Sequence, residues 1–305
     1  MFGLFQELAF PDRLLFEPKK YYIGSLTATF INRNTAGTFF GLALVINVSV
    51  AMHYLKGVRL RALARRTLEG DFSVHGPERK ALLYAAFCVA VATALFRTQS
   101  RGGVGATFIG VALQFTISAM RPLTADQSNP EAPRGSYVRR LVAGVLVLAA
   151  VFAMLAERSI YRMEDENGSG ARLCVYQSIL GALHDQLPWG AGFGAFEDTY
   201  RMYRLPECGG IAATWDRAHN VYLEGLLGFG AIFALAFSVG LATLTVTLIR
   251  GARMRHRLRH IPVGGIAGLA LVMTHSLVDF SLQIPGFAVY FAAAMAAAAT
   301  VSSAR

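Results

Sequence analysis

The chain has 305 residues, of which 54% are hydrophobic and 16% are charged. Soluble globular domains carry about 25% charged residues, so this composition excludes an ordinary soluble protein and indicates a protein embedded in a membrane. The formal net charge is +10, but the lysines and arginines are spread over separate loops and form no single basic face, which argues against a nucleic-acid partner.

Apolar stretches recur along the chain and predict an all-α, polytopic membrane bundle of about seven transmembrane helices. A helix needs roughly 20 predominantly apolar residues to cross the hydrocarbon core, and each stretch is near that length. The predicted spans are Thr35 to Leu55, Ala81 to Phe96, Gly102 to Met120, Leu141 to Ala156, Leu226 to Ile249, Ile261 to Val278 and Ile284 to Val301. We interpret residues 1–305 as a single membrane domain.

The basic residues of the loops predict the orientation. Residues 56–80 hold seven lysines or arginines, residues 121–140 hold four, and residues 250–260 hold five. Short loops rich in these residues stay on the cytoplasmic side. The seven spans then alternate without adjustment across a bacterial inner membrane, and residues 157–219 form one large periplasmic loop.

This orientation also makes a prediction about the amino end. An odd number of spans with a cytoplasmic carboxyl end places Met1 outside, and residues 1–20 lack the pattern of a cleavable signal peptide. We therefore expect either a start codon further upstream or a longer membrane protein of which this chain is the carboxyl portion.

The large loop contains a helical pattern. Apolar residues at helical spacing predict an amphipathic helix from Arg172 to Leu187, lying against the membrane or the bundle. These residues are Leu173, Tyr176, Ile179, Leu180 and Leu183. A second short helix is predicted from Phe196 to Tyr203.

Between these helices, the run WGAGFGAF follows Pro188. Its three glycines permit a close approach of the backbone to a ligand, or a tight turn. Cys174 and Cys208 also lie in this loop. An oxidising compartment permits a disulfide between them without requiring one, so two unlinked thiols remain the alternative.

Polar residues that are costly near a bilayer gather at the outer ends of the predicted helices. They are Asn32, Arg33, Asn34, Arg97, Gln99, Ser100, Arg101, Arg172, His219, Asn220, His275 and Asp279. Arginines that converge at one depth repel one another unless an anion joins them, and the planar guanidinium suits phosphate. The pattern predicts a site for a lipid pyrophosphate. The alternative for each arginine is a contact with a lipid headgroup.

Two histidines at this level are candidates for chemistry. His219 closes the large loop beside Arg217. Neighbouring cations favour the neutral imidazole, which a general base needs to take a proton from a sugar hydroxyl. His275 and Asp279 lie four residues apart, so they are predicted to form a hydrogen-bonded pair that either closes the bundle or takes part in chemistry.

Other kinds of chemistry have little support in the sequence. Metal-ligand spacing of histidines or carboxylates is missing, and so is the GxSxG pattern of a serine nucleophile. A transporter or flippase for a lipid-linked glycan is an alternative. It would be expected to have charged residues along a path through the bundle, but His53 is almost the only ionisable residue inside the predicted spans. A non-catalytic remnant is a further alternative.

Four segments together resemble the O-antigen ligase and polymerase superfamily of bacterial inner-membrane enzymes. Their order, spacing and placement on the predicted topology carry the resemblance, which runs over nearly the whole chain. The segments are TATFINRNTAGTFFGLAL from Thr27, SRGGVGATFIG from Ser100, RLCVYQSILGALHDQLPWGAGFGAFEDTY from Arg172 and HNVYLEGLLGFG from His219. Superfamily members commonly have ten or more helices, so the chain is similar to their carboxyl-terminal two thirds, without the amino-terminal helices.

Ligase and polymerase are both compatible with this resemblance. The ligase pattern matches His219, Asn220 and Gly230, but Phe233 stands where that pattern has Gly, Thr or Tyr. The NRN of residues 32–34 and the HSLVDFSLQIP of residues 275–285 are more similar to exopolysaccharide polymerases.

The resemblance implies a reaction and its participants. A glycan would pass from an undecaprenyl-pyrophosphate carrier to a hydroxyl of a saccharide or lipid A-core acceptor in the periplasm, without nucleotide, metal or other cofactor. His219 would take the acceptor's proton, while Arg101 and Arg172 would stabilise the pyrophosphate. The substrate-binding residues would be Arg33, Asn32, Asn34, Ser100, Arg97 and Asn220. Trp189 and Trp215 suit either stacking on sugars or anchoring at the membrane interface.

Overall fold

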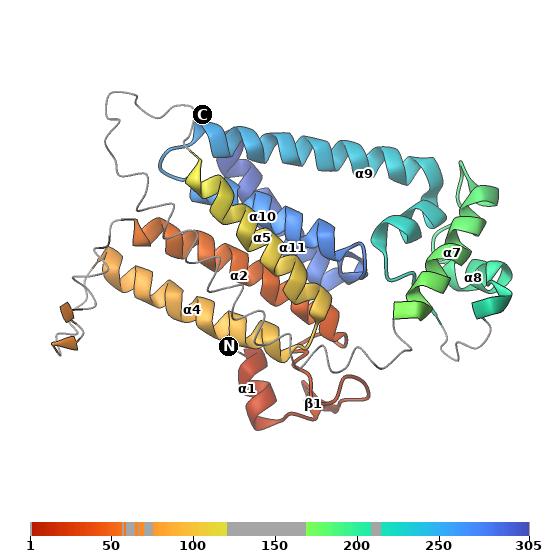
Figure 1. The fold of residues 1–305 in the computed structure, drawn as a ribbon, viewed down its shortest axis with the longest axis horizontal. Coiled ribbons are helices and arrows are strands. Elements are labelled where there is room, and N and C mark those ends of the chain that lie inside the picture. Colours follow the sequence, from red (N-terminus) through yellow and green to blue (C-terminus); the bar gives the residue numbers. More distant parts are fainter. Residues whose placement is uncertain are drawn as a thin grey trace.

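The computed structural model describes residues 2–56, 58, 65, 66, 68, 69, 76–120, 169–208 and 215–304. Helices make up most of this part of the chain (Figure 1). The α-helices described are α1 (Phe2–Ala9), α2 (Arg33–Leu55), α4 (Pro77–Arg97), α5 (Arg101–Ala119), α7 (Ser169–Gln186), α8 (Phe196–Tyr203), α9 (Val221–Met254), α10 (His260–His275) and α11 (Pro285–Ser303). The remaining elements are an antiparallel hairpin of β1 (Arg13–Leu14) and β2 (Glu17–Pro18) and the 3-10 helices η1 (Pro206–Cys208) and η2 (Ser281–Gln283).

The membrane spans agree with the apolar pattern. Among the described helices, α2, α4, α5, α9 and α11 are long and apolar enough to cross a membrane, and α10 is a shorter apolar helix of 16 residues. These six helices coincide with six of the predicted spans, apart from small shifts at their ends. The predicted span Leu141 to Ala156 lies outside the described residues. The chain is an all-α polytopic membrane protein.

The bundle is held together by close approaches between helices at small residues. Helix α2 packs against α4, α5 and α10. A Cβ atom at Gly41 of α2 would lie 2.1 Å from Oγ1 of Thr107 in α5, and one at Gly110 of α5 would lie 2.8 Å from the carbonyl oxygen of Ala267 in α10. Within lipid, where no hydrophobic effect drives helices together, such contacts are the main source of association.

The segments that connect the helices gather at two ends of the bundle (Figure 1). One end holds the amino termini of α2, α5 and α11, together with α1, β1 and the α7–α8 pair. The other end holds the carboxyl termini of α2, α5 and α9 and the start of α10. This arrangement separates the described loops predicted to be periplasmic from those predicted to be cytoplasmic. The side of the membrane that each end faces stays a prediction.

The α7–α8 pair packs on the amino-terminal part of α9. Its core includes Val175, Ile179 and Leu183 of α7 with Phe196 and Tyr200 of α8. Helix α8 spans the predicted residues, and α7 starts three residues earlier than predicted and ends one residue earlier. The pair therefore shares a small core with the amino-terminal part of α9.

The apolar residues predicted for α7 divide between a buried and an exposed face. Ile179 and Leu183 are buried against α8 and α9, together with Val175 and Ala182. Leu173 and Leu180 are 59% and 57% exposed. The helix is confirmed, and the prediction that it lies against the membrane or the bundle holds for the bundle at its buried face.

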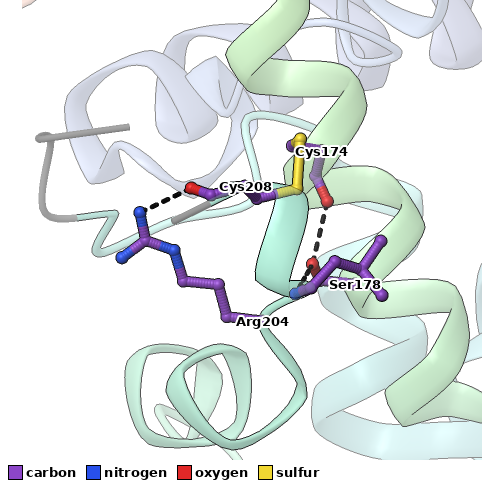
Figure 2. Close-up of a disulfide and its surroundings, with 5 residues drawn as sticks. Cys174, Ser178, Arg204 and Cys208 are labelled. Carbon is purple, nitrogen blue, oxygen red and sulfur yellow. Dashed lines mark hydrogen bonds between the residues drawn. A yellow bond between two sulfur atoms is a disulfide. The ribbon is translucent and has the colours of Figure 1, made fainter. Parts of the chain in front are cut away.

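Cys174 of α7 and Cys208 of η1 form a disulfide, with their Cα atoms 5.9 Å apart (Figure 2). Ser178 donates a hydrogen bond to the carbonyl of Cys174 at 2.9 Å, and Arg204 donates one to the carbonyl of Cys208 at 2.8 Å. The bridge fastens the segment after α8 to α7, together with a hydrogen bond from the backbone N–H of Leu205 to Oγ of Ser178 at 3.4 Å. Of the two alternatives left open for these cysteines, the structure has the linked one.

Candidate active site

Three of the polar residues at the outer helix ends are N-caps. Asn32 caps α2, Ser100 caps α5 and Asn220 caps α9, each accepting a hydrogen bond from a backbone N–H two or three residues later at 2.7–3.2 Å. Caps satisfy donors that the first helical turn leaves unpaired. These side chains thus have a structural task, and their part in substrate binding stays a prediction.

The caps also bring two arginines to adjoining helix starts. Oγ of Ser100 donates a hydrogen bond to Oδ1 of Asn34 at 3.0 Å, which joins the start of α5 to the start of α2. Arg33 and Arg101 are the first residues of these helices, and the guanidinium of Arg33 lies 5.4 Å from the centre of the Tyr22 ring. Because the amino end of a helix carries a partial positive charge, the pairing favours an anion here.

Arg97 is placed differently from the other predicted arginines. It is the last residue of α4, and its guanidinium forms an ion pair with Glu7 of α1, with Nε donating to the carboxylate at 2.8 Å. The carboxylate of Glu7 neutralises the positive charge of Arg97, and binding of a pyrophosphate would need that charge. Helix α1 itself was not predicted from the sequence.

His219 lies between two aromatic rings directly before α9. Its imidazole meets the ring of Trp215 edge-on at 5.3 Å and that of Phe280 at 4.8 Å between centroids. Burial lowers the pKa of His219 from its ordinary value, and the charge of Arg172 lowers it further, while Asp279 acts in the opposite direction. The surroundings therefore favour a neutral imidazole at pH 7, the form that accepts a proton.

Helix α7 brings Arg172 to this histidine. The hydroxyl of Tyr176, one turn after Arg172, lies 3.2 Å from the carbonyl oxygen of His219 and 3.3 Å from that of Leu277. The charge of Arg172 is close enough to influence the pKa values of both Tyr176 and His219. Arg172 and His219, which the sequence predicted to act together, thus lie within electrostatic range of one another.

A buried polar network follows α10 and closes against α2. Oγ1 of Thr38 lies 2.6 Å from Nδ1 of His275 and 2.8 Å from Oγ of Ser281. Ser281 in turn donates both its hydroxyl and its backbone N–H to Oδ2 of Asp279. The predicted direct pair of His275 and Asp279 is wrong, because two hydroxyl groups from other elements stand between them.

A second network, absent from the sequence-based predictions, holds the backbone before His219. Glu224 accepts a hydrogen bond from the N–H of Ala218 at 2.9 Å and lies 3.4 Å from the guanidinium of Arg217. Arg217 also donates to Gln283 at 2.8 Å. The only sequence signal for Glu224 is its place one turn into the helix that follows His219.

The glycine-rich run after Pro188 docks on a bend in α9. At Gly230 the helix has φ +57° and ψ −139°, and Figure 1 shows the ribbon turning back there. A Cβ atom at Gly230 would lie 2.0 Å from the carbonyl oxygen of Pro188, and one at Gly190 would lie 2.7 Å from the backbone nitrogen of Gly230. Gly190 and Gly230 thus allow two backbones of this chain to approach one another. Gly190, Gly192 and Gly194 all have positive φ, and the run contains a turn at residues 193–195, as one of the two predicted alternatives had it.

Phe233 fills the inside of this bend. A Cβ atom at Gly225 would lie 2.3 Å from the ring of Phe233, which stacks on Phe237 at 5.2 Å, and Phe237 in turn meets Tyr222 at 5.5 Å. The aromatic residue at this position therefore belongs to the packing of the bent helix.

Comparison with known proteins agrees with this architecture. A family model described as O-antigen ligase matches residues 86–238, about half of the chain. The match covers the second half of α4, all of α5, the α7–α8 pair, His219 and the bend of α9. Among curated proteins, none matches the chain.

Proposed function

Because the chain belongs to the O-antigen ligase family, we propose that it transfers a glycan from an undecaprenyl-pyrophosphate carrier to an acceptor hydroxyl of a saccharide or of lipid A-core. The reaction takes place at the periplasmic face of the inner membrane. Two observations support this side: the basic segment of residues 250–260 lies at the opposite end of the bundle, and the disulfide of the large loop suits an oxidising compartment.

The pyrophosphate lies against the arginines of the outer end. Arg101 and Arg33 stand at adjoining helix starts, and Arg172 reaches the same end from α7. Guanidinium groups donate paired hydrogen bonds to phosphate oxygens, and the helix starts add their partial positive charge. These groups stabilise the negative charge that grows on the pyrophosphate as its bond to the sugar breaks, without a metal ion.

His219 acts on the acceptor. Its neutral imidazole takes the proton of the acceptor hydroxyl while the hydroxyl oxygen bonds to the anomeric carbon of the donor glycan. The bond between that carbon and the pyrophosphate oxygen breaks in the same reaction, and undecaprenyl pyrophosphate leaves. The observation that carries the proposal is the placement of His219 between two aromatic rings, with Arg172 beside it and a pKa below the ordinary value.

The test is glycan transfer by the reconstituted full chain from a purified undecaprenyl-pyrophosphate donor. His219→Ala is expected to reduce turnover by about 100- to 10,000-fold, the usual range for a general base, while the donor still binds. His184→Ala is the matched control, because His184 lies in the same loop with its side chain 90% exposed. Wild-type turnover in His219→Ala would remove the assignment. Supplying lipid A-core or a second lipid-linked glycan as acceptor separates ligase from polymerase activity.

A further inference from the structure

A pocket lies at the end of the bundle opposite the candidate active site. Its walls come from the carboxyl-terminal turns of α2 and α5 and from the start of α10. Its lining includes the polar residues Ser49, His53, Lys56, Ser118, Arg259 and His260. None of the described residues that line it is acidic. The pocket is therefore positively charged and separate from the chemistry proposed above.

Arg259 is fixed in the wall of this pocket. Its Nε donates to the carbonyl oxygen of Ala252 at 2.7 Å and its Nη2 to that of Ile117 at 2.9 Å. These carbonyls belong to the last turns of α9 and α5, where a cation is stabilised by the helix dipole. A guanidinium held in this way loses little further conformational entropy when it binds a ligand.

Two histidines form another part of the lining. The rings of His53 and His260 stack with their centroids 4.1 Å apart, and Ser49 donates a hydrogen bond to the backbone carbonyl of His260. Nδ1 of His260 is buried and has no hydrogen-bond partner among the described residues. Buried polar atoms are seldom left without a partner, and because this nitrogen has almost no exposed surface, the partner that suits it is a small polar group such as a water molecule.

Lys56 supplies the second full positive charge. It follows the last residue of α2, and its side chain is exposed beside the pocket. Two like charges in one lining raise the energy of the empty pocket, and an anion between them removes this cost. The pocket also lies at the ends of membrane-spanning helices, where lipid headgroups are found.

We propose that this pocket binds an anionic phosphate group, held by Lys56, Arg259 and the two histidines. The phosphate belongs either to the headgroup of an anionic phospholipid in the adjoining leaflet or to free phosphate. A bound lipid at this place would join the ends of α2, α5 and α10, and so stabilise the helices that carry the candidate active site at their other ends.

The experiment uses the full chain in nanodiscs of phosphatidylcholine that contain increasing amounts of phosphatidylglycerol. Native mass spectrometry measures how much phosphatidylglycerol the released protein retains. Lys56→Gln is expected to weaken retention by roughly tenfold, the effect of losing one charged hydrogen bond, and Lys56→Arg is expected to preserve it. Arg253→Gln is the control, because Arg253 is an exposed cation at the same end of the bundle that does not line the pocket.

A second measurement identifies the source of the phosphate. Thermal unfolding of the detergent-purified protein is followed in inorganic phosphate and in chloride at equal ionic strength. Retention of phosphatidylglycerol that depends on Lys56 supports the lipid source, and protection by inorganic phosphate alone that depends on Lys56 supports free phosphate. Equal losses in Lys56→Gln and Arg253→Gln, or no dependence on Lys56 in either measurement, would overturn the proposal.

Discussion

Gly102 lies against the ring of His275, so closely that a Cβ atom at position 102 would be 2.7 Å from Nε2 of the histidine. The contact joins the start of α5, which carries Arg101, to the buried network of His275 and Thr38. The ring cannot easily move aside, because its other nitrogen is 2.6 Å from Oγ1 of Thr38 and the side chain is only 2% exposed. Because position 102 has no side chain, the start of α5, which carries Arg101, can lie directly against His275 of α10.

Gly102→Ala is therefore expected to destabilise the protein by about 1–3 kcal/mol, as overpacking of a buried site does, and to reduce glycan transfer. Thermal unfolding in detergent and the transfer assay measure the two effects. Gly105→Ala, in the same helix, is the control, since a Cβ atom there would meet nothing within 4 Å. Equal behaviour of the two variants would contradict the close contact.

Arg101 is expected to need its planar guanidinium. Arg101→Ala should weaken both donor binding and turnover. Arg101→Lys keeps the charge but loses the fork that binds two phosphate oxygens, so it should recover little activity. Donor binding and transfer are measured separately, with Arg13→Lys as a control at an exposed arginine of the amino-terminal hairpin. Full activity in Arg101→Lys would reduce Arg101 to an anchor for lipid headgroups.

The pH dependence of turnover is expected to follow His219. Its folded pKa lies below the ordinary value of about 6.5, so the base is neutral at pH 7 and turnover should fall as the pH drops through the lowered pKa. Because the folded state resists protonation there, stability also declines below pH 6.5, and circular dichroism must show that the protein stays folded.

Arg172→Gln tests the cause of this pKa. Burial is the main cause and is unchanged, but the loss of the positive charge of Arg172 should raise the pKa of His219 and shift the acid limb of the normalised rate profile toward higher pH. Asp279 and Asp216, which raise this pKa, and Arg217, which lowers it, remain in place. Arg201→Gln, an exposed arginine of α8, should leave the limb where it is.

The disulfide gives a prediction that does not depend on activity. Denatured, non-reduced protein should react with one equivalent of alkylating reagent, at Cys88, and reduced protein with three, as counted by mass spectrometry. Cys208→Ser removes a bridge across a separation of 34 residues, for which loop-closure entropy predicts a loss of about 4 kcal/mol. Three labels without reduction would exclude the bridge in the isolated protein.

The proposed orientation is tested by labelling cysteines in intact cells with a reagent that does not cross the inner membrane. Phe193→Cys, at a position 87% exposed in the large loop, should react. Arg257→Cys, in the basic loop before α10, should be protected until the cells are opened. The reverse pattern would invert the topology and place the candidate site in the cytoplasm.

The membrane helices could be predicted because each is a long apolar run, and a run of that kind has one stable state in lipid. Helix α8 could also be predicted from its composition. The buried polar network could not be predicted, because it depends on a contact between Thr38 and His275. These residues are 237 positions apart, and no local sequence pattern indicates such a contact. Helix α1, which has eight residues, was not predicted.

Spacing was least informative where backbones approach each other. The glycines after Pro188 indicated that something would come close, but a ligand, a turn and a second backbone demand the same absence of side chains. The predicted roles of Asn32, Ser100 and Asn220 met a similar ambiguity, since the residue types that bind sugars and phosphates also cap helices.

The bend at Gly230 has a consequence for depth. A straight helix of 34 residues would rise about 51 Å, well beyond a hydrocarbon core of about 30 Å. The part after the bend, residues 231–254, rises roughly 36 Å and is sufficient to cross the bilayer with some tilt. The part before it, which begins beside His219, is not needed to cross the bilayer. In the proposed reaction the bend therefore sets the depth of the His219 imidazole near the membrane surface, where the pyrophosphate of a lipid-linked donor is expected.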